Sequence, residues 1–265
     1  MKTNKKKGIV SLSFLIMTFI CLYFNTQTET ASMEITCKDG SVMILIPAGE
    51  FVMGSPEGAG DTDETPPHTV YLDAYYIDKY EVTVGQYRKF CQETRQPMPC
   101  APNWEQTDSH PIVNITWEEA SAYAQYYGKR LPTEAEWEKA CRAGSNTKYS
   151  FGDEDSQLWE YAWYEANSEK KTYPVGQKKP NAYGLYDMHG NAWEWCSDFY
   201  RADYYTGSPA ANPQGPASGR HHAMRGGSWF NNPSHCRCAY RDWQEPDYWY
   251  GPFGFRCAIS APAPQ

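Results

Sequence analysis

The sequence predicts an α+β fold in which little of the chain forms regular secondary structure. The 265 residues include 20 Gly and 19 Pro, and 15% are aromatic, a composition typical of aromatic clusters joined by irregular loops. Strand and helix patterns lie in the first half, whereas beyond Gly144 no such pattern persists for ten residues. Backbone of that kind is normally either disordered or organised by function. Its many Trp and Tyr residues argue against disorder, because a chain rich in them can bury enough apolar area to fold.

The N-terminal 32 residues have the composition of a secretory signal peptide. Met1–Lys7 carries four lysines, Gly8–Phe24 is an almost uncharged apolar run, and Asn25–Ser32 is polar. An uncleaved anchor is the alternative, because an apolar run of about 17 residues is at the short end of the membrane-spanning range. We therefore expect export to the periplasm or the cell exterior, with a membrane as partner only if residues 1–32 stay attached.

The charge of the exported part is strongly negative. Removal of residues 1–32 takes away four Lys and one Glu, so the net charge of −8 becomes −11. Duplex nucleic acid is a poor partner for such a surface. About 230 residues remain, which favours one domain over two independent ones.

Three strands are expected early in the exported part. Ser41–Ile46 is an apolar run that predicts a buried strand, and the Pro-Ala-Gly that follows it predicts a turn. Glu50–Gly54 would return as the hairpin partner of this strand. After a loop rich in Gly, Pro and acidic residues over Ser55–Pro67, His68–Ile77 alternates as a third strand.

Three capping boxes predict the starts of three short helices. In each box, a Thr hydroxyl and a Gln or Glu three residues later satisfy free backbone donors at the helix start. The boxes are Thr83-Val-Gly-Gln86, Thr116-Trp-Glu-Glu119 and Thr133-Glu-Ala-Glu136, each followed by aromatic or small apolar residues at helical spacing. Brief strand patterns follow at Ala223–Ser228 and Arg237–Arg241.

The cysteine count favours disulfides. Nine Cys become eight if Cys21 leaves with the signal peptide, and an even number in an exported chain is typical of disulfide pairing. Cys91 and Cys100 are close enough in sequence for a local bridge. Cys236 and Cys238 form a Cys-x-Cys pair, which would also suit a metal-binding site.

Six motifs are found in order across nearly the whole exported part. The segment Asn181–Trp195, which mixes Gly, Asn, Asp, Glu and two Trp, suits neither a regular helix nor a strand and indicates a loop that holds a ligand. The other five are Ile46–Gly54, Tyr80–Thr83, Gly128–Glu138, Arg225-Gly-Gly-Ser-Trp229 and Gly254-Phe-Arg-Cys257. Together they resemble the formylglycine-generating, or sulfatase-modifying-factor, family from Val42 to Ala258.

The resemblance implies a fold and a domain arrangement. The expected fold is the C-type-lectin-like variant of the α+β architecture that this family has, with little regular secondary structure. One domain would cover residues 42–260, after an N-terminal segment at 33–41 and before a tail at 261–265.

The residues that carry out the family's oxidation chemistry are only partly present in this sequence. Members that oxidise a sulfatase Cys to formylglycine use oxygen and a Cu⁺ ion held between two thiolates, since soft sulfur ligands suit Cu⁺. Here Asn231 follows Gly226-Gly227-Ser228 where the family has its first Cys, and Cys236 is the candidate for the second. One sulfur cannot form the two-coordinate site, so Cu⁺ is not expected. Ser228 and Cys236 are the remaining catalytic candidates.

The resemblance also implies a disulfide and a calcium site. Cys141 and Cys238 match a family disulfide, whereas the family's partner position for Cys257 is Ala124 here. The loop that binds Ca²⁺ in the family offers side-chain and carbonyl oxygens, which Ca²⁺ prefers. Its matching residues are Asp187, Gly190, Asn191, Ala192 and Glu194. The alternative is a polar turn whose Asn and Glu side chains cap backbone donors.

These observations favour an exported, Ca²⁺-binding family member that binds a peptide or small ligand, with a non-copper role in oxidative tailoring as the enzymatic option. The aromatic loops Trp159–Tyr164 and Trp243–Tyr250 are candidates for the walls of a ligand groove, although much of them would equally suit a core. His221-His222 is expected to be exposed. The alternatives are a formylglycine-generating oxidase that uses Cys236 and a structural component of the cell surface.

Overall fold

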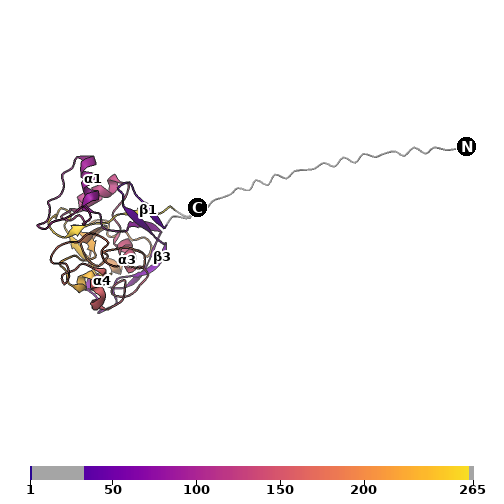
Figure 1. The fold of residues 1–265 in the computed structure, drawn as a ribbon. Coiled ribbons are helices and arrows are strands. Elements are labelled where there is room, and N and C mark those ends of the chain that lie inside the picture. Colours follow the sequence, from indigo (N-terminus) through magenta and orange to yellow (C-terminus); the bar gives the residue numbers. More distant parts are fainter. Residues whose placement is uncertain (2–32, 263–265) are drawn as a thin grey trace. The chain divides into compact units, whose positions relative to one another are not determined.

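The structure, a computed structural model, describes Met1 and residues 33–262 (Figure 1). The predicted signal peptide otherwise lies outside the described residues. Within the described part, no helix combines the length and the apolar character that crossing a membrane requires.

Three antiparallel or mixed sheets form the β part of the fold. The first has the order β1-β2-β5-β10, the second pairs β3 with β4, and the third has the order β8-β7-β6-β9 with β6 and β9 parallel. Their bounds are β1 Glu34–Thr36, β2 Val42–Ile46, β3 Gly49–Met53, β4 His68–Leu72, β5 Tyr75–Asp78, β6 Trp193–Phe199, β7 His222–Arg225, β8 Asp242–Gln244, β9 Phe253–Gly254 and β10 Ala258–Ser260.

Short helices cover the rest of the regular structure. The α-helices are α1 Val84–Thr94, α2 Trp117–Tyr126, α3 Glu134–Arg142 and α4 Leu158–Tyr161, and the 3₁₀ helices are η1 Thr62–Glu64, η2 Asp155–Gln157, η3 Tyr204–Thr206 and η4 Pro233–Cys236. All three predicted capping boxes are confirmed: in α3, the Glu136 amide donates to Thr133 Oγ1 at 3.1 Å and the Thr133 amide to Glu136 Oε2 at 2.8 Å.

The predicted pairing of the first strands is wrong. β2 and β3 do not form a hairpin, because β2 pairs with β1 and β5 while β3 pairs with β4 in a separate sheet. Gly49, at φ 143°, lets the chain leave the first sheet directly after β2. The predicted strand His68–Ile77 is likewise two strands, which lie in different sheets.

The second half contains more strand than its sequence pattern predicts. β7 confirms the first half of the predicted strand Ala223–Ser228, whereas Gly226–Ser228 lies outside it. Arg237–Arg241 forms a turn in which the Tyr240 amide donates to the Arg237 carbonyl at 3.2 Å. The third sheet is centred instead on β6, whose first four residues are all buried. An almost continuously buried strand has no alternating pattern, which is why the sequence did not indicate it.

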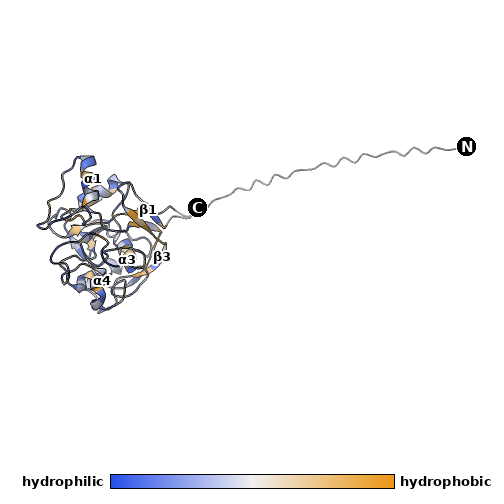
Figure 2. Cartoon of the chain, in the orientation of Figure 1, coloured by the Kyte–Doolittle hydropathy of each residue, from blue (hydrophilic) through white to orange (hydrophobic). Residues whose placement is uncertain are grey.

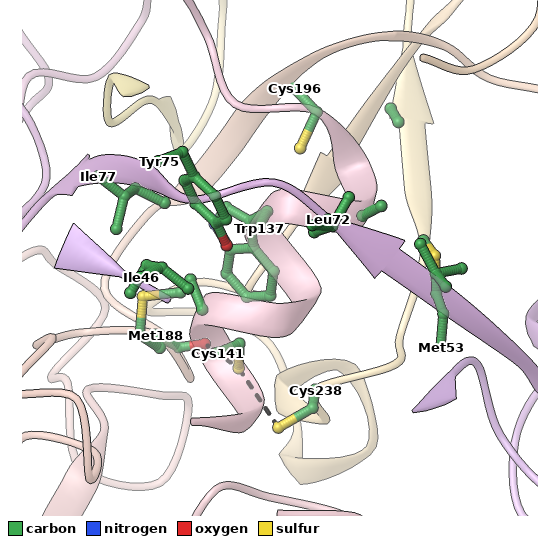
Figure 3. Packing of buried hydrophobic residues seen from close by; sticks show 14 of the residues in the cluster. Ile46, Met53, Leu72, Tyr75, Ile77, Trp137, Cys141, Met188, Cys196 and Cys238 are labelled. Atoms are coloured by element: carbon green, nitrogen blue, oxygen red, sulfur yellow. Dashed lines mark hydrogen bonds between the residues drawn. The ribbon is translucent and has the colours of Figure 1, made fainter. Parts of the chain in front are cut away.

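Helix α3 lies at the centre of the molecule, where Trp137 and Cys141 pack against Ile46, Leu72 and other apolar residues (Figure 3). Figure 2 shows the contrast between apolar strand segments near the β1 label and polar turns of α1. All nine residues of α3 are buried, its charged ones included. Because isolated charges are costly in a core, the α3 charges need partners: Arg142 pairs with Glu138 within the helix, and Lys139 donates to the Pro47 and Gly49 carbonyls.

Candidate functional site

The loop Asp187–Glu194 has a backbone that few residues tolerate. Asp187 and Asn191 have φ angles of 61° and 69°, in the left-handed region where Asn and Asp are enriched. A Cβ on Gly190 would lie 2.3 Å from the Trp163 carbonyl oxygen, so only glycine fits there. The backbone of this loop therefore requires Gly at position 190 and favours Asp or Asn at positions 187 and 191.

Asn191 joins the loop to Glu81, which lies between β5 and α1. Its side-chain amide donates to Glu81 Oε2 at 2.7 Å, and the Ala192 amide donates to Glu81 Oε1 at 2.9 Å. The Tyr173 amide donates to the side-chain oxygen of Asn191 at 3.0 Å. The oxygen predicted to be a calcium ligand thus already accepts a hydrogen bond from the protein.

Glu194 is held by a guanidinium and an indole. Arg256 donates to both carboxylate oxygens, at 2.6 and 2.7 Å, and Trp137 Nε1 donates to Oε2 at 2.7 Å. All three side chains are fully buried. A bidentate pair of this kind is among the stronger interactions of a carboxylate.

Asp187 is the unsatisfied member of the loop. Its Oδ2 accepts the Gly176 amide at 2.7 Å, but its buried Oδ1 has no hydrogen-bond partner among the described residues. Burial raises the pKa of Asp187 to about 6. Burial, and then the nearby Asp187 and Glu194 carboxylates, also raise the pKa of Glu81 well above its usual range.

The charges around this loop are unbalanced. We call Glu81, Asp187, Glu194 and Arg256 the loop cluster; it contains three carboxylates and one guanidinium, all at most 2% exposed. A cation beside Asp187 would satisfy the free oxygen and offset the excess negative charge. The chemistry of the cluster therefore fits a hard cation such as Ca²⁺, although Asn191 and Glu194 already have protein partners.

The Gly226-Gly227-Ser228 segment packs against the same loop. The Trp229 amide donates to the Asn191 carbonyl at 3.1 Å, and fully buried Ser228 donates its hydroxyl to Asn231 Oδ1 at 2.5 Å. Asn231, which stands where the resemblance predicts the family's first Cys, therefore accepts the Ser228 hydroxyl. Among the described residues, the hydroxyl has no His or carboxylate partner of the kind that activates a nucleophile.

Cys236, at the end of η4, packs beside Gly227: a Cβ on that glycine would lie 3.1 Å from the Cys236 sulfur. Its fully buried sulfur lies among Tyr149, Leu158 and Tyr164 and contacts the Asn232 carbonyl at 3.6 Å. Burial raises the pKa of this thiol. The environment therefore disfavours the thiolate that metal binding or nucleophilic attack requires.

The two cysteines predicted to pair lie side by side. Cys141 on α3 faces Cys238 with 3.3 Å between their sulfurs, and both are free thiols in the structure (Figure 3). Cys91 and Cys100 are free as well: Cys91 is buried with its sulfur 3.4 Å from the Pro97 carbonyl, and Cys100 is exposed. The sequence did not indicate that His189 joins Cys141 and Cys238, because three segments far apart in the chain bring them together.

The aromatic loops are partly exposed and partly built into the fold. Trp159 is 56% exposed and Trp249 is 48% exposed. Trp163, in contrast, stacks on Tyr173 with 3.8 Å between the ring centroids. The prediction that His221-His222 is exposed is wrong for His222. This side chain is buried and stacks on Trp117 with 3.9 Å between the ring centroids. That aromatic stacking explains its burial.

Two open cavities lie elsewhere on the described surface. One, of about 320 Å³, is lined by residues of β3 and the end of α3, including Phe51, Lys139 and Arg142. The other, of about 540 Å³, lies between Thr62–Pro67 and the Ala202–Thr206 turn. Both are large enough for a small ligand or part of a peptide.

Comparison with known proteins agrees with this geometry. The model of the sulfatase-modifying factor enzyme 1-like domain matches residues 29–261. The chain belongs to this family. It is 33% identical over 279 residues to the formylglycine-generating enzyme of Streptomyces coelicolor, covering 82% of this chain and 89% of that protein.

Two solved structures have the same fold. PvdO from Pseudomonas aeruginosa superposes with a TM-score of 0.77 at 28% identity, over 86% of this chain and 98% of that one. Treponema denticola variable protein 1 gives a TM-score of 0.77 at 29% identity, over 87% of this chain and all of that one. The predicted C-type-lectin-like variant of the α+β fold is confirmed.

Proposed function

We propose that this chain is an exported family member that binds Ca²⁺ and a peptide or small ligand, and that it does not make formylglycine at a copper-bridged thiolate pair. The observation that carries the proposal concerns Asn231, which stands where the resemblance predicts the family's first thiol. Its Oδ1 accepts the Ser228 hydroxyl at 2.5 Å. A side-chain amide is a hard donor and does not replace sulfur in a Cu⁺ site.

The buried position of Cys236 supports the same proposal. Its sulfur has a carbonyl as its polar neighbour and apolar rings around it, so no second soft ligand is in place among the described residues. Among those residues, the cysteine sulfurs that contact each other are Cys141 and Cys238. For a non-copper role in oxidative tailoring, the catalytic candidates are Ser228 and Cys236.

Calcium is proposed at the loop cluster. Asp187 Oδ1 would be the first ligand, since it is buried and has no partner among the described residues. The Gly190 and Ala192 carbonyls and the side chains of Asn191 and Glu194 would supply the remaining protein oxygens. Bound Ca²⁺ would neutralise charge and fix the loop against which Trp229 packs, without itself taking part in catalysis.

The ligand is proposed to contact the exposed aromatic rings of the two loops, Trp159 in one and Trp249 and Tyr250 in the other. Tyr250 is 67% exposed, and rings this large leave apolar area in water that a peptide or small molecule would cover. Thermal-shift screening tests this, with Trp249→Ala expected to abolish the shift that a hit causes in the unaltered protein. A structural cell-surface role would give no small-molecule hit and tight association with partner proteins.

The main test is for formylglycine formation. The purified protein is incubated with Cu⁺, oxygen and a Cys-x-Pro-x-Arg peptide, and the mass change of Cys-to-aldehyde conversion is measured beside the S. coelicolor enzyme as positive control. We expect no conversion. The informative companion is Asn231→Cys, which restores the missing residue type at its own position. Turnover by the unaltered protein that Cys236→Ala abolishes would overturn the proposal and establish the oxidase alternative.

A further inference from the structure

One buried cation lines a cavity without an anionic partner. Lys139, in the last turn of α3, is 5% exposed and lines the cavity of about 320 Å³ beside β3. Its ammonium group donates to the Pro47 and Gly49 carbonyls, each at 2.8 Å. An ammonium group has three N–H donors. One donor and the whole positive charge are therefore left without a partner among the described residues.

The two carbonyl contacts explain the position of Lys139 but not its charge. They join α3 to the connection between β2 and β3, which a neutral donor would also do. Burial lowers the pKa of Lys139, and no carboxylate offsets that effect. Lys129, which is about as buried, instead pairs with Asp39 and Asp78 at 2.6 and 3.0 Å. Since a buried charge without a partner is costly, Lys139 calls for an anion that the described chain does not supply.

The other charged groups of the cavity do not change this balance. Arg142 lines it too, but its guanidinium pairs with Glu138 at 2.8 Å and donates to the Gly54 carbonyl at 2.9 Å. Glu50 also lines the cavity, but it is exposed, so that water screens its charge. The cavity therefore presents one uncompensated positive charge, at Lys139.

We propose that this cavity binds a small organic anion through a single carboxylate, which pairs with Lys139, while the apolar part of the ligand covers Phe51 and Val52. Both apolar residues line the cavity, and Val52 is 39% exposed. The volume suits a ligand of this size. The site is separate from the aromatic loops proposed above and goes beyond the function proposed for them.

Neutral donors around the cavity suit the remaining lone pairs of a carboxylate. Asn146 and Tyr183 line it, and among the described residues neither the Asn146 amide nor the Tyr183 hydroxyl has a hydrogen-bond partner. Burial raises the pKa of Tyr183, so its hydroxyl keeps the proton that it would donate. A phosphate dianion would require more cations than this one ammonium group. The donor set therefore favours a monoanion.

The second cavity has the opposite chemistry. Glu57, Asp63 and Asp203 line it, and no Lys or Arg is among its described lining residues. A carboxylate would be repelled there by like charges. Carboxylate binding by this protein would therefore report on the cavity at Lys139.

A matched pair of ligands tests the role of the charge. N-acetyl-phenylalanine and its neutral amide, N-acetyl-phenylalaninamide, are titrated into the purified protein by calorimetry, beside 3-phenylpropanoate as a free acid without a peptide group. We expect the acid to bind at least about tenfold more tightly than the amide, the usual effect of a charged hydrogen bond. Preference for the acetylated acid would identify a peptide C-terminus as the ligand, and equal binding a free carboxylic acid. Equal affinity of acid and amide, or no binding of either acid at about 10 mM, would overturn the proposal.

Variants assign the binding to this cavity. Lys139→Met keeps the aliphatic stem and should weaken binding of the acid about tenfold, without effect on the amide. Lys89→Met is the matched control, because Lys89 is an exposed helical lysine of α1 that does not line the cavity. Full binding by Lys139→Met, or an equal loss in the control, would contradict the assignment.

Glu50 provides a test that does not depend on the folding of the Lys139 variant. Glu50 is exposed, so Glu50→Gln should leave the melting temperature unchanged. It removes a like charge from the edge of the cavity and should strengthen binding of the acid about twofold, as expected for a screened charge. Weaker binding of the acid by Glu50→Gln would show that the carboxylate is not held in this cavity.

Discussion

Two buried charged clusters meet around α3, and they differ in balance. The α3 cluster contains the carboxylates of Glu134 and Glu138 and the guanidinium groups of Arg142, Arg225 and Arg241. Arg241 donates to both oxygens of Glu134 at 2.7 and 2.9 Å, and Arg142 donates to Glu138 at 2.8 Å. The loop cluster has three carboxylates for one guanidinium, and an oxygen of Asp187 without a partner among the described residues.

The pKa values of the two clusters show what this difference means. Burial alone would raise the pKa of Glu134, but Arg241 and Arg225 lower it below its usual range. In the loop cluster burial raises the pKa of Asp187, and Arg256 does not offset it. Both clusters are equally removed from water, so the number of cations decides the outcome. In the α3 cluster three guanidinium groups face two carboxylates, whereas in the loop cluster one guanidinium faces three carboxylates.

Removal of a cation from the α3 cluster should have the largest effect. Arg225→Ala leaves Glu138 buried with one fewer partner and also removes hydrogen bonds to the Ala239 and Tyr240 carbonyls, at 2.8 and 2.6 Å. We expect a loss of about 3–5 kcal/mol in the free energy of unfolding, the usual cost of breaking a buried pair from one side. Urea unfolding measures it, and a loss below about 1 kcal/mol would mean that this cluster does not hold α3.

Calcium should act on the unbalanced cluster alone. At a Ca²⁺ concentration 100 times its dissociation constant, the folded state should gain about 2.7 kcal/mol relative to chelated protein. Asp187→Asn should abolish this gain. Asp198→Asn should retain it, since Asp198 is another buried aspartate of raised pKa but accepts from Glu134 and Ser197 instead. Equal melting temperatures with chelator and with Ca²⁺ would remove the site.

The dependence on pH should have an unusual sign at Asp187. Its folded pKa of about 6 lies above the ordinary 3.8, so between these values the folded state binds the proton more tightly than the unfolded state. Without Ca²⁺, its contribution to stability is therefore full below pH 3.8 and is lost as the pH rises to about 6. The gain from Ca²⁺ should grow over the same window. Unfolding curves of the chelated protein and of Asp187→Asn, compared across this range, isolate the effect, and identical pH profiles would refute it.

An exposed ion pair should have the smallest effect. Arg201 and Asp203 are 2.6 Å apart, but their side chains are 60% and 72% exposed. Water screens such pairs, so Arg201→Ala should change the free energy of unfolding by less than about 1 kcal/mol. A cost as large as that of Arg225→Ala would show that burial does not explain the difference between buried and exposed pairs in this protein.

The sequence predicted the parts of the fold that depend on local interactions. The capping boxes at Thr83, Thr116 and Thr133 gave the three main helix starts correctly, because each needs only residues three positions apart. It did not predict which strands pair, since the partner of β3 is chosen by packing across the core. It also missed β6, whose buried residues do not alternate.

The candidate site divides in the same way. From the sequence alone come the family, the replacement of a thiol by Asn231, and the Asp187, Asn191 and Glu194 loop, because residue identity and order are enough for them. Only the tertiary structure shows that Arg256 pairs with Glu194 and that Glu81 brings a third carboxylate to the loop cluster. It also shows that His189 lies beside Cys141 and Cys238. These groups are far apart in the chain, and their charges and ligand atoms interact only at distances of a few ångströms, which the folded core alone provides.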